Sequence, residues 1–241
     1  MTSHEPAEYG SGRLMISETF ISRQGEGKLT CVESFFIRTS GCNLRCWFCD
    51  TPYASWQPEG KSFTIEQLME QISQLSTKYV VLTGGEPLLA SAYQVLVKTL
   101  QASGLHVTVE TAGTIEKPMP VDLLSLSPKL SGSGPDKTEN HRWSVLHEQR
   151  RLPIHVMKRL LEAAREIQIK FVVSHPTQLE EICDVVDRLG VAAEHVFLMP
   201  EGTTIQAMDN ARQWLLPMCQ STGFQPCDRM QIRWYGNRRG T

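Results

Sequence analysis

Short apolar runs alternate with longer amphipathic segments along most of this chain. Runs of this length without interruption are typical of parallel β-strands that are covered on both faces. The segments between them carry apolar residues at helical spacing. Before one of these segments, Thr64 and Gln67 form a sequence pattern typical of a capping box, which predicts a helix start. Pro176 and Thr177 with Glu180 suggest another helix cap. The apolar runs are residues 14–20, 34–39, 79–82, 107–109, 123–126, 169–173 and 195–198.

Strands and helices that alternate in this way predict repeated βαβ units and a parallel sheet. Six such units would make an α/β fold in the form of an incomplete (βα)6 barrel, with ligand-binding residues at the C-terminal ends of the strands. We expect a single domain over residues 1–241, with a flexible N-terminus at 1–12 and a long loop at 130–153. Residues 230–235 alternate like a half-exposed strand, within a C-terminal tail at 228–241 that we expect to close the site.

Composition narrows the class of protein. The chain has 241 residues, 41% hydrophobic and 21% charged, which is typical of a soluble globular protein. A formal net charge of −2 provides no overall attraction to nucleic acid or anionic lipid, so we expect neither as a partner. The first twelve residues lack the apolar stretch of a secretory signal, and seven cysteines are an odd count that fits reduced thiols. We therefore expect a cytoplasmic protein.

Cys42, Cys46 and Cys49 bring three thiols within eight residues. Four ligands would complete a structural zinc site or a closed iron–sulfur cluster, but Cys31 lies eleven residues upstream and the nearest histidines are His4 and His106. A 4Fe-4S cluster held by three thiolates keeps one iron open for another ligand. The alternatives are a zinc knuckle that lacks a ligand and three unrelated core cysteines.

The spacing C-x3-C-x2-C, with Phe48 before the last cysteine, resembles the radical S-adenosylmethionine (SAM) superfamily, and residues 84–87 resemble its GGE motif. This resemblance implies an incomplete barrel of the radical SAM type in which some helices are modified or missing. It also implies that SAM chelates the open iron and that one electron from the cluster releases a 5′-deoxyadenosyl radical. The glycine pair would let backbone groups approach SAM, and the Glu86 carboxylate would accept hydrogen bonds from its ammonium.

A narrower resemblance rests on motifs that occur in a fixed order: residues 23–27, Arg38, residues 49–51, residues 110–114 and residues 127–129. Together they resemble the 7-carboxy-7-deazaguanine synthase family. That family implies a radical SAM lyase that converts 6-carboxy-5,6,7,8-tetrahydropterin into 7-carboxy-7-deazaguanine with loss of ammonia, in queuosine and 7-deazapurine biosynthesis. It also implies a homodimer and an electron donor such as a flavodoxin or ferredoxin.

The resemblance assigns roles position by position, with no catalytic residue beyond the cluster and the SAM radical. The 4Fe-4S ligands would be Cys42, Cys46 and Cys49, and Thr51 would bind Mg²⁺ as an oxygen ligand, the alternative being a plain loop residue. The pterin would contact Arg23, Gln24, Gly25, Glu26, Arg38 and Thr83. SAM would contact Gly85, Glu86, Glu110, Ser127, Pro128, Lys129, Met199, Pro200, Glu201 and Gly202.

The sequence departs from this family at two places. Gln231 stands where several relatives have a histidine, and Met199-Pro200-Glu201 replaces a Gln-Pro pair. Two further groups have open interpretations: the histidines at 141 and 147 are solvated or bind metal, and the tail arginines at 229, 233, 238 and 239 close over an anionic substrate or are solvated. Two other functions remain: a radical SAM enzyme that activates a glycyl-radical protein, and a non-catalytic iron–sulfur or zinc protein.

Overall fold

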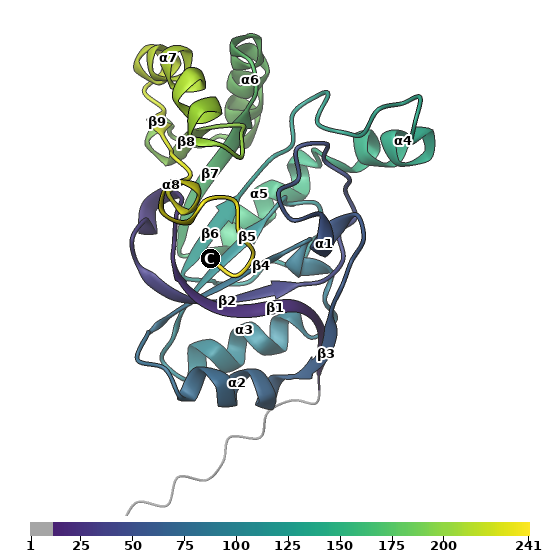
Figure 1. Cartoon of the computed structure of the whole chain (residues 1–241), viewed down its shortest axis with the longest axis vertical. Helices are drawn as coiled ribbons and strands as arrows, with labels where there is room; N and C mark the ends of the chain where they lie inside the picture. Colours follow the sequence, from purple (N-terminus) through teal and green to yellow (C-terminus); the bar gives the residue numbers. More distant parts are fainter. Residues whose placement is uncertain (1–11) are drawn as a thin grey trace, which may run out of the picture.

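The computed structural model describes residues 12–241, and the flexible N-terminus predicted for 1–12 lies, apart from Gly12, outside them. One nine-stranded sheet organises the chain (Figure 1), in the order β3-β1-β2-β4-β5-β6-β7-β8-β9. The strands are β1 (Arg13–Arg23), β2 (Glu33–Thr39), β3 (Lys61–Thr64), β4 (Tyr79–Gly84), β5 (His106–Thr111), β6 (Leu123–Leu126), β7 (Glu166–Val173), β8 (Val196–Pro200) and β9 (Gln225–Pro226). The helices are α1 (Pro52–Ser55), α2 (Ile65–Ser73), α3 (Tyr93–Ala102), α4 (His141–Arg150), α5 (Ile154–Ala163), α6 (Leu179–Leu189), α7 (Ile205–Thr222) and α8 (Met230–Tyr235).

The parallel part of the sheet forms the predicted incomplete barrel. Strands β2, β4, β5, β6, β7 and β8 pair in parallel, one after the next, and β9 adds two residues in the same direction. Strand β1 is antiparallel to both β2 and β3, and the outer strands β3 and β9 do not pair with each other. The connection from β5 to β6 contains no helix. The barrel is therefore open, with one helix missing from its repeat, as the sequence predicted.

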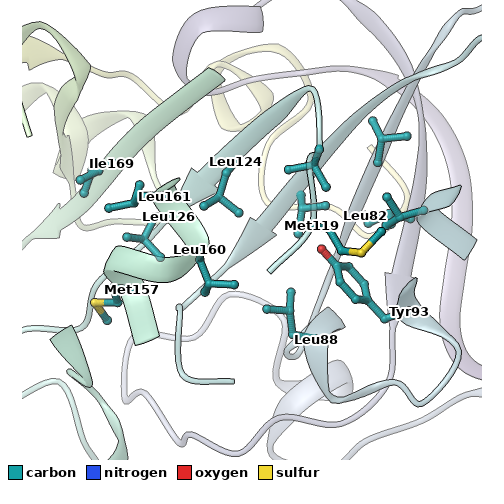
Figure 2. Packing of buried hydrophobic residues seen from close by; sticks show 14 of the residues in the cluster. Leu82, Leu88, Tyr93, Met119, Leu124, Leu126, Met157, Leu160, Leu161 and Ile169 are labelled. Carbon is teal, nitrogen blue, oxygen red and sulfur yellow. The ribbon is translucent and has the colours of Figure 1, made fainter. Parts of the chain in front are cut away.

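Side chains of the parallel strands alternate between a hydrophobic layer and an inner face, because successive strand residues point to opposite sides of a sheet. In β7, Ile169, Phe171 and Val173 are fully buried in the core, whereas Lys170 and Val172 line a cavity on the other face. Figure 2 shows the hydrophobic layer, where Met157, Leu160 and Leu161 of α5 lie beside residues of β6 and β7. Burying each such side chain is worth roughly 1.5–3 kcal/mol.

The helix caps agree with the sequence in one place and differ in another. At α2 the predicted capping box is present: Gln67 N donates to Thr64 Oγ1 (3.2 Å) and Thr64 N donates to Gln67 Oε1 (2.9 Å). The cap predicted from Thr177 and Glu180 was wrong. His175 and Gln178 form the capping box instead, at the short 3-10 turn (Pro176–Gln178) that leads into α6. Thr177 N donates to His175 Nδ1 (3.3 Å), and His175 N donates to Gln178 Oε1 (3.2 Å).

Two predicted segments differ from the structure. Residues 130–153 contain helix α4, which the sequence did not reveal because only Ser144 and His147 of that helix are buried and no apolar stripe results. Residues 230–235 form helix α8 rather than a strand. The alternation of apolar residues suggested a strand, but Ile232 is the one buried residue of this helix, so the pattern does not reflect a buried strand face. Within residues 12–241, no helix is long and apolar enough to cross a membrane.

Candidate active site

The inner face of the sheet carries a cavity of about 640 Å³ at the C-terminal ends of its parallel strands. Sixteen of the twenty predicted site residues line this cavity. They are Arg23, Gln24, Gly25, Glu26, Arg38, Cys42, Cys46, Cys49, Thr51, Thr83, Gly85, Glu110, Ser127, Lys129, Met199 and Glu201. The other four, Glu86, Pro128, Pro200 and Gly202, are not among the lining residues. Strand register explains part of this convergence, since Arg38 of β2 pairs with Thr83 of β4.

The loop that follows β2 places all three predicted cluster cysteines on the cavity wall. Leu44 N donates to Cys42 Sγ (3.4 Å), and Cys49 Sγ lies 3.1 Å from Ser55 Oγ. Burial raises the pKa of Cys42 to about 12 and that of Cys46 to about 11, so both are protonated at neutral pH and must lose a proton to bind iron. Within residues 12–241, no three His, Cys, Asp or Glu side chains converge closely enough to share one metal ion.

Arg45 and His147 brace the cysteine loop from outside the cavity. Arg45 Nη1 donates to the carbonyls of Cys42 and Leu44 (2.7 Å each), and its guanidinium lies 3.9 Å from the ring centroid of Trp143 in α4. Arg45 N donates to Nδ1 of His147 (3.1 Å), whose Nε2 lies 2.9 Å from Ser133 Oγ.

His147 is fully buried, and burial lowers its pKa to about 4, with the charges of Arg151 and Lys129 acting in the same direction. Solvation, one of the two interpretations that the sequence left open for these histidines, is therefore wrong for His147. His141 is exposed. The buried imidazole is a neutral hydrogen-bonding link between the cysteine loop and α4.

The glycine pair at the end of β4, Gly84 and Gly85, packs against the protein backbone. A Cβ on Gly85 would lie 2.1 Å from Gly41 O and 2.5 Å from Ala54 O, and a Cβ on Gly84 would lie 2.3 Å from Thr39 O. These glycines let the end of β4 fit against the cysteine loop, which is a different reason for glycine from the predicted approach of backbone to a ligand.

Glu86 is 1% exposed and bonds to the protein. Its carboxylate accepts hydrogen bonds from Leu88 N (3.2 Å), Thr111 Oγ1 (2.7 Å) and Ala112 N (3.0 Å). Burial raises the pKa of Glu86, against the effect of these hydrogen bonds. In this structure, then, the carboxylate ties the end of β4 to the end of β5, whereas the sequence had suggested that it meets the SAM ammonium.

Glu26 lies at the centre of a charged network on the predicted substrate side. Its Oε2 accepts a hydrogen bond from Lys170 Nζ (2.8 Å), and its Oε1 accepts one from Gln231 Nε2 (2.7 Å) and lies 3.5 Å from Arg229 Nε. Burial alone would raise the pKa of Glu26, but Lys170 and Arg229 lower it to about 2. Glu26 is therefore a charged acceptor throughout the physiological range.

Lys170 and Arg229 line the cavity, although the sequence analysis gave neither a defined role. Lys170 was hidden inside an apolar run, and the only available signal was its alternation with Gln168 on the same strand face. Arg229 donates to Gly202 O (2.7 Å) and pairs with Asp50, which lies between Cys49 and Thr51. This arginine thus connects the tail to the cysteine loop.

Arg38 and two phenylalanines form another part of the wall. Arg38 Nε donates to Glu18 Oε1 (2.7 Å), which also accepts a hydrogen bond from Tyr53 Oη (2.8 Å). Phe20 and Phe36 stack with ring centroids 4.8 Å apart, and the Arg38 guanidinium lies 5.6 Å from the Phe20 centroid. A guanidinium beside a flat apolar surface suits a planar ligand that carries a carboxylate.

Residues 236–241 of the C-terminal tail contribute to the lining of the cavity. Figure 1 shows this yellow segment over the inner side of the sheet. Arg239 stacks 4.1 Å from the ring centroid of Tyr53 and pairs with Glu18 (3.2 Å) and Glu59 (2.9 Å). Arg233 pairs with Asp209 and Asp228. These arginines are therefore bound to protein carboxylates rather than simply solvated, and Arg238 is an exposed lining residue.

Comparisons with known proteins point to one family. The family model described as the radical SAM superfamily matches residues 36–189. A 7-carboxy-7-deazaguanine synthase from Rhodopirellula baltica is 56% identical over 98% of this chain and 91% of its own length. One from Halobacterium salinarum is 38% identical over 96% of this chain and 94% of its own length. The crystal structure of QueE from Escherichia coli has a TM-score of 0.65 at 23% identity, covers 90% of this chain and 93% of that chain, and supports the fold.

Proposed function

This chain belongs to the 7-carboxy-7-deazaguanine synthase family of the radical SAM superfamily, and we propose that it contracts the ring of 6-carboxy-5,6,7,8-tetrahydropterin to 7-carboxy-7-deazaguanine with loss of ammonia. It is accordingly a radical SAM lyase of queuosine and 7-deazapurine biosynthesis, and its family uses a 4Fe-4S cluster and SAM. The relatives separate it from the glycyl-radical activating enzymes and from non-catalytic iron–sulfur or zinc proteins.

The observation that carries the proposal is a single cavity with two chemically different ends. Three thiols line one end, and the charged network of Glu26 with the Arg38 and phenylalanine wall lines the other. Its volume of about 640 Å³ is within the range usual for small-molecule sites. A radical generated at the thiol end would thus be enclosed together with a ligand at the charged end.

The chain's own residues position the reactants. Cys42, Cys46 and Cys49 would hold the cluster, which with SAM supplies the radical that removes a hydrogen atom from C6 of the substrate. Arg38 would bind the substrate carboxylate in forked geometry, and Glu26 would accept hydrogen bonds from N–H groups of the pterin. Ser127 and Lys129, joined by a 2.7 Å hydrogen bond, would contact SAM together with Gly85, Glu110, Met199 and Glu201.

Mg²⁺ is part of the proposal, with Thr51 as its protein ligand. The Thr51 hydroxyl lies on the cavity wall, 3.8 Å from Cys49 Sγ, so it could offer an oxygen ligand to a cation in the cavity. Hard cations prefer oxygen ligands and often complete their shell with substrate oxygens. We further propose a single domain, a homodimer in the cytoplasm, and an electron donor such as a flavodoxin or ferredoxin.

Anaerobic reconstitution tests the function. The protein loaded with iron and sulfide is incubated with 6-carboxy-5,6,7,8-tetrahydropterin, SAM, Mg²⁺ and dithionite, and 7-carboxy-7-deazaguanine is measured by mass spectrometry. We expect product in the full mixture and much less when Mg²⁺ is replaced by a chelator. An intact cluster that cleaves SAM but yields no deazaguanine would refute the proposed reaction, and full activity in chelator would refute the role of Mg²⁺.

A further inference from the structure

Lys170 lies between two carboxylates that the sequence assigned to two different ligands. Its Nζ donates to Glu26 Oε2 (2.8 Å), a predicted pterin contact, and to Glu110 Oε1 (3.0 Å), a predicted SAM contact. The lysine is 4% exposed, in the middle of β7, with the fully buried Ile169 and Phe171 on either side. An ammonium in such a position is costly unless it is paired, so its place on the cavity wall calls for an explanation.

The other oxygen of Glu26 is held as well. Gln231 Nε2 donates to Oε1, and a Cβ on Gly25 would lie only 2.0 Å from Gln231 Oε1, so the amide packs directly against the loop that carries Glu26. Glu26 is thus fixed from two sides, by β7 and by α8. Lys170 and Arg229 are two cations that face the three carboxylates of Glu26, Glu110 and Asp50, so each cation is shared between two carboxylates.

We propose that Lys170 is a positioning residue for the reaction: it holds the Glu26 and Glu110 carboxylates in place as charged acceptors for the N–H-bearing edge of the pterin and for a hydroxyl or amino group of SAM. This inference rests on the proposed function and adds the residue that aligns the two ligands with each other. A carboxylate with one oxygen held by an ammonium and the other by an amide keeps its remaining lone pairs in fixed directions. Such an acceptor suits a guanidine-like edge of neighbouring N–H groups.

The electrostatic surroundings of Glu26 give the proposal a readout that packing alone would not give. The titratable groups that face Glu26 are Lys170 of β7, Arg229 before α8 and Cys227 after β9, with Glu110 and Asp50 behind the two cations. Burial raises the pKa of Glu26, and the two cations reverse this effect. Removal of one cation should therefore raise the pKa of Glu26 toward pH 6 to 8, the range in which the kinetics are measured.

The test compares Lys170→Met with Lys170→Arg, and uses Lys117→Met as the control. Lys117 is a partly buried lysine that donates to Ala90 O (2.9 Å) and does not line the cavity. Steady-state kinetics at pH 6 to 8 are combined with calorimetric titration of 6-carboxy-5,6,7,8-tetrahydropterin into each protein. We expect Lys170→Met to raise both KM and Kd for the pterin about ten- to a hundred-fold, because charge-assisted hydrogen bonds are lost. The loss should grow as the pH falls from 8 to 6.

The arginine variant separates charge from position. The KM of Lys170→Arg should not rise as the pH falls from 8 to 6, as in the wild type, because the positive charge remains. The longer side chain should displace the two carboxylates and so raise KM at every pH. If Lys170→Met does not fold, an elevated KM with a flat pH profile in Lys170→Arg still supports the proposal, and an unchanged KM overturns it. Lys170→Met with wild-type KM, Kd and pH profile overturns the inference while the wild type still makes product. Absence of product from the wild type would instead refute the proposed function.

Discussion

Substitution of Gly85 by alanine tests how the two motifs of the thiol end fit together. A Cβ at this position would lie 2.1 Å from Gly41 O, and Cβ contacts below 3.0 Å are essentially never observed. Gly41 and residue 85 must therefore move apart by at least 0.9 Å, the difference between these two distances. Gly41 is also the point where three segments meet, since Glu86 N donates to Gly41 O (2.9 Å) and Gly41 N donates to Ala54 O (2.8 Å).

The cost follows from these contacts. Overpacking by one methyl group costs about 1–3 kcal/mol, and each of the two hydrogen bonds is worth about 1 kcal/mol. The local cost is therefore about 3–5 kcal/mol. This amount is a large part of the stability of an ordinary domain, about 5–15 kcal/mol, and it acts directly on the loop that begins with Cys42. We expect Gly85→Ala to fold but to hold much less cluster.

The assay measures iron and sulfide per chain after anaerobic reconstitution, and SAM affinity by calorimetry. Gly104→Ala is the control, because Gly104 has open space where its Cβ would lie, and its positive φ (75°), which Gly85 lacks, adds only local backbone strain. This control should lose about 1–2 kcal/mol of stability through backbone strain and keep full cluster loading. If Gly85→Ala binds iron and SAM as the wild type does, the close fit between the β4 end and the cysteine loop does not govern assembly of the site.

Three further predictions test other parts of the site. Cys46→Ala should keep its far-UV circular dichroism but lose iron and SAM cleavage, whereas Cys183→Ala in α6 should keep both, and retained cleavage in Cys46→Ala would show that this thiol is not a ligand. Arg38→Ala should raise the KM for the pterin about ten- to a hundred-fold with little change in SAM affinity, and equal losses for both ligands would remove its assigned role. The pKa of His147 is lowered to about 4 in the folded protein, whereas in the unfolded chain this histidine takes up a proton below about pH 6.5. The apoprotein should therefore lose stability as the pH falls from 6.5 to 4, because the unfolded state binds the proton and the folded state does not. In urea denaturation, His147→Ala should be less stable at pH 7, and its free energy of unfolding should change less with pH. The same pH dependence as in the wild type would exclude a contribution of His147 to the loss of stability.

All the strands except the short outer strands β3 and β9, and sixteen of the residues that line the cavity, were predictable because they depend on local patterns. An apolar run marks a parallel strand, and the residue after the run lies at the strand's C-terminal end whatever the rest of the chain does. Glu110, Ser127 and Met199 each follow an apolar run, the family resemblance assigned all three to SAM, and all three line the cavity. Helix α8 escaped prediction because six residues with a single buried position do not distinguish a period of 2 from one of 3.6.

The charged contacts were not predictable because their partners are far apart in the sequence. Lys170 is 144 residues from Glu26, Arg229 is 179 residues from Asp50, and Gln231 is 205 residues from Glu26. No local pattern specifies such pairs, since each requires the whole sheet to be in register first. Glu86 shows the opposite case: the motif was found, but only the fold reveals that its carboxylate bonds to β5 and the segment after it.

The two ends of the cavity are built by different physical means, and this difference suits their chemistry. At the thiol end, backbone packs on backbone through Gly84 and Gly85, which creates a rigid wall with little side-chain freedom. At the other end, buried ion pairs join the loop after β1 to β7, β5 and the tail, and such pairs contribute little net stability because the desolvation of the charges offsets their attraction. A network that adds little to folding but keeps Glu26 charged against a pocket wall is better explained by ligand binding. Arg229 and Gln231 hold Glu26 and line the cavity, and we therefore propose that they serve ligand binding rather than folding.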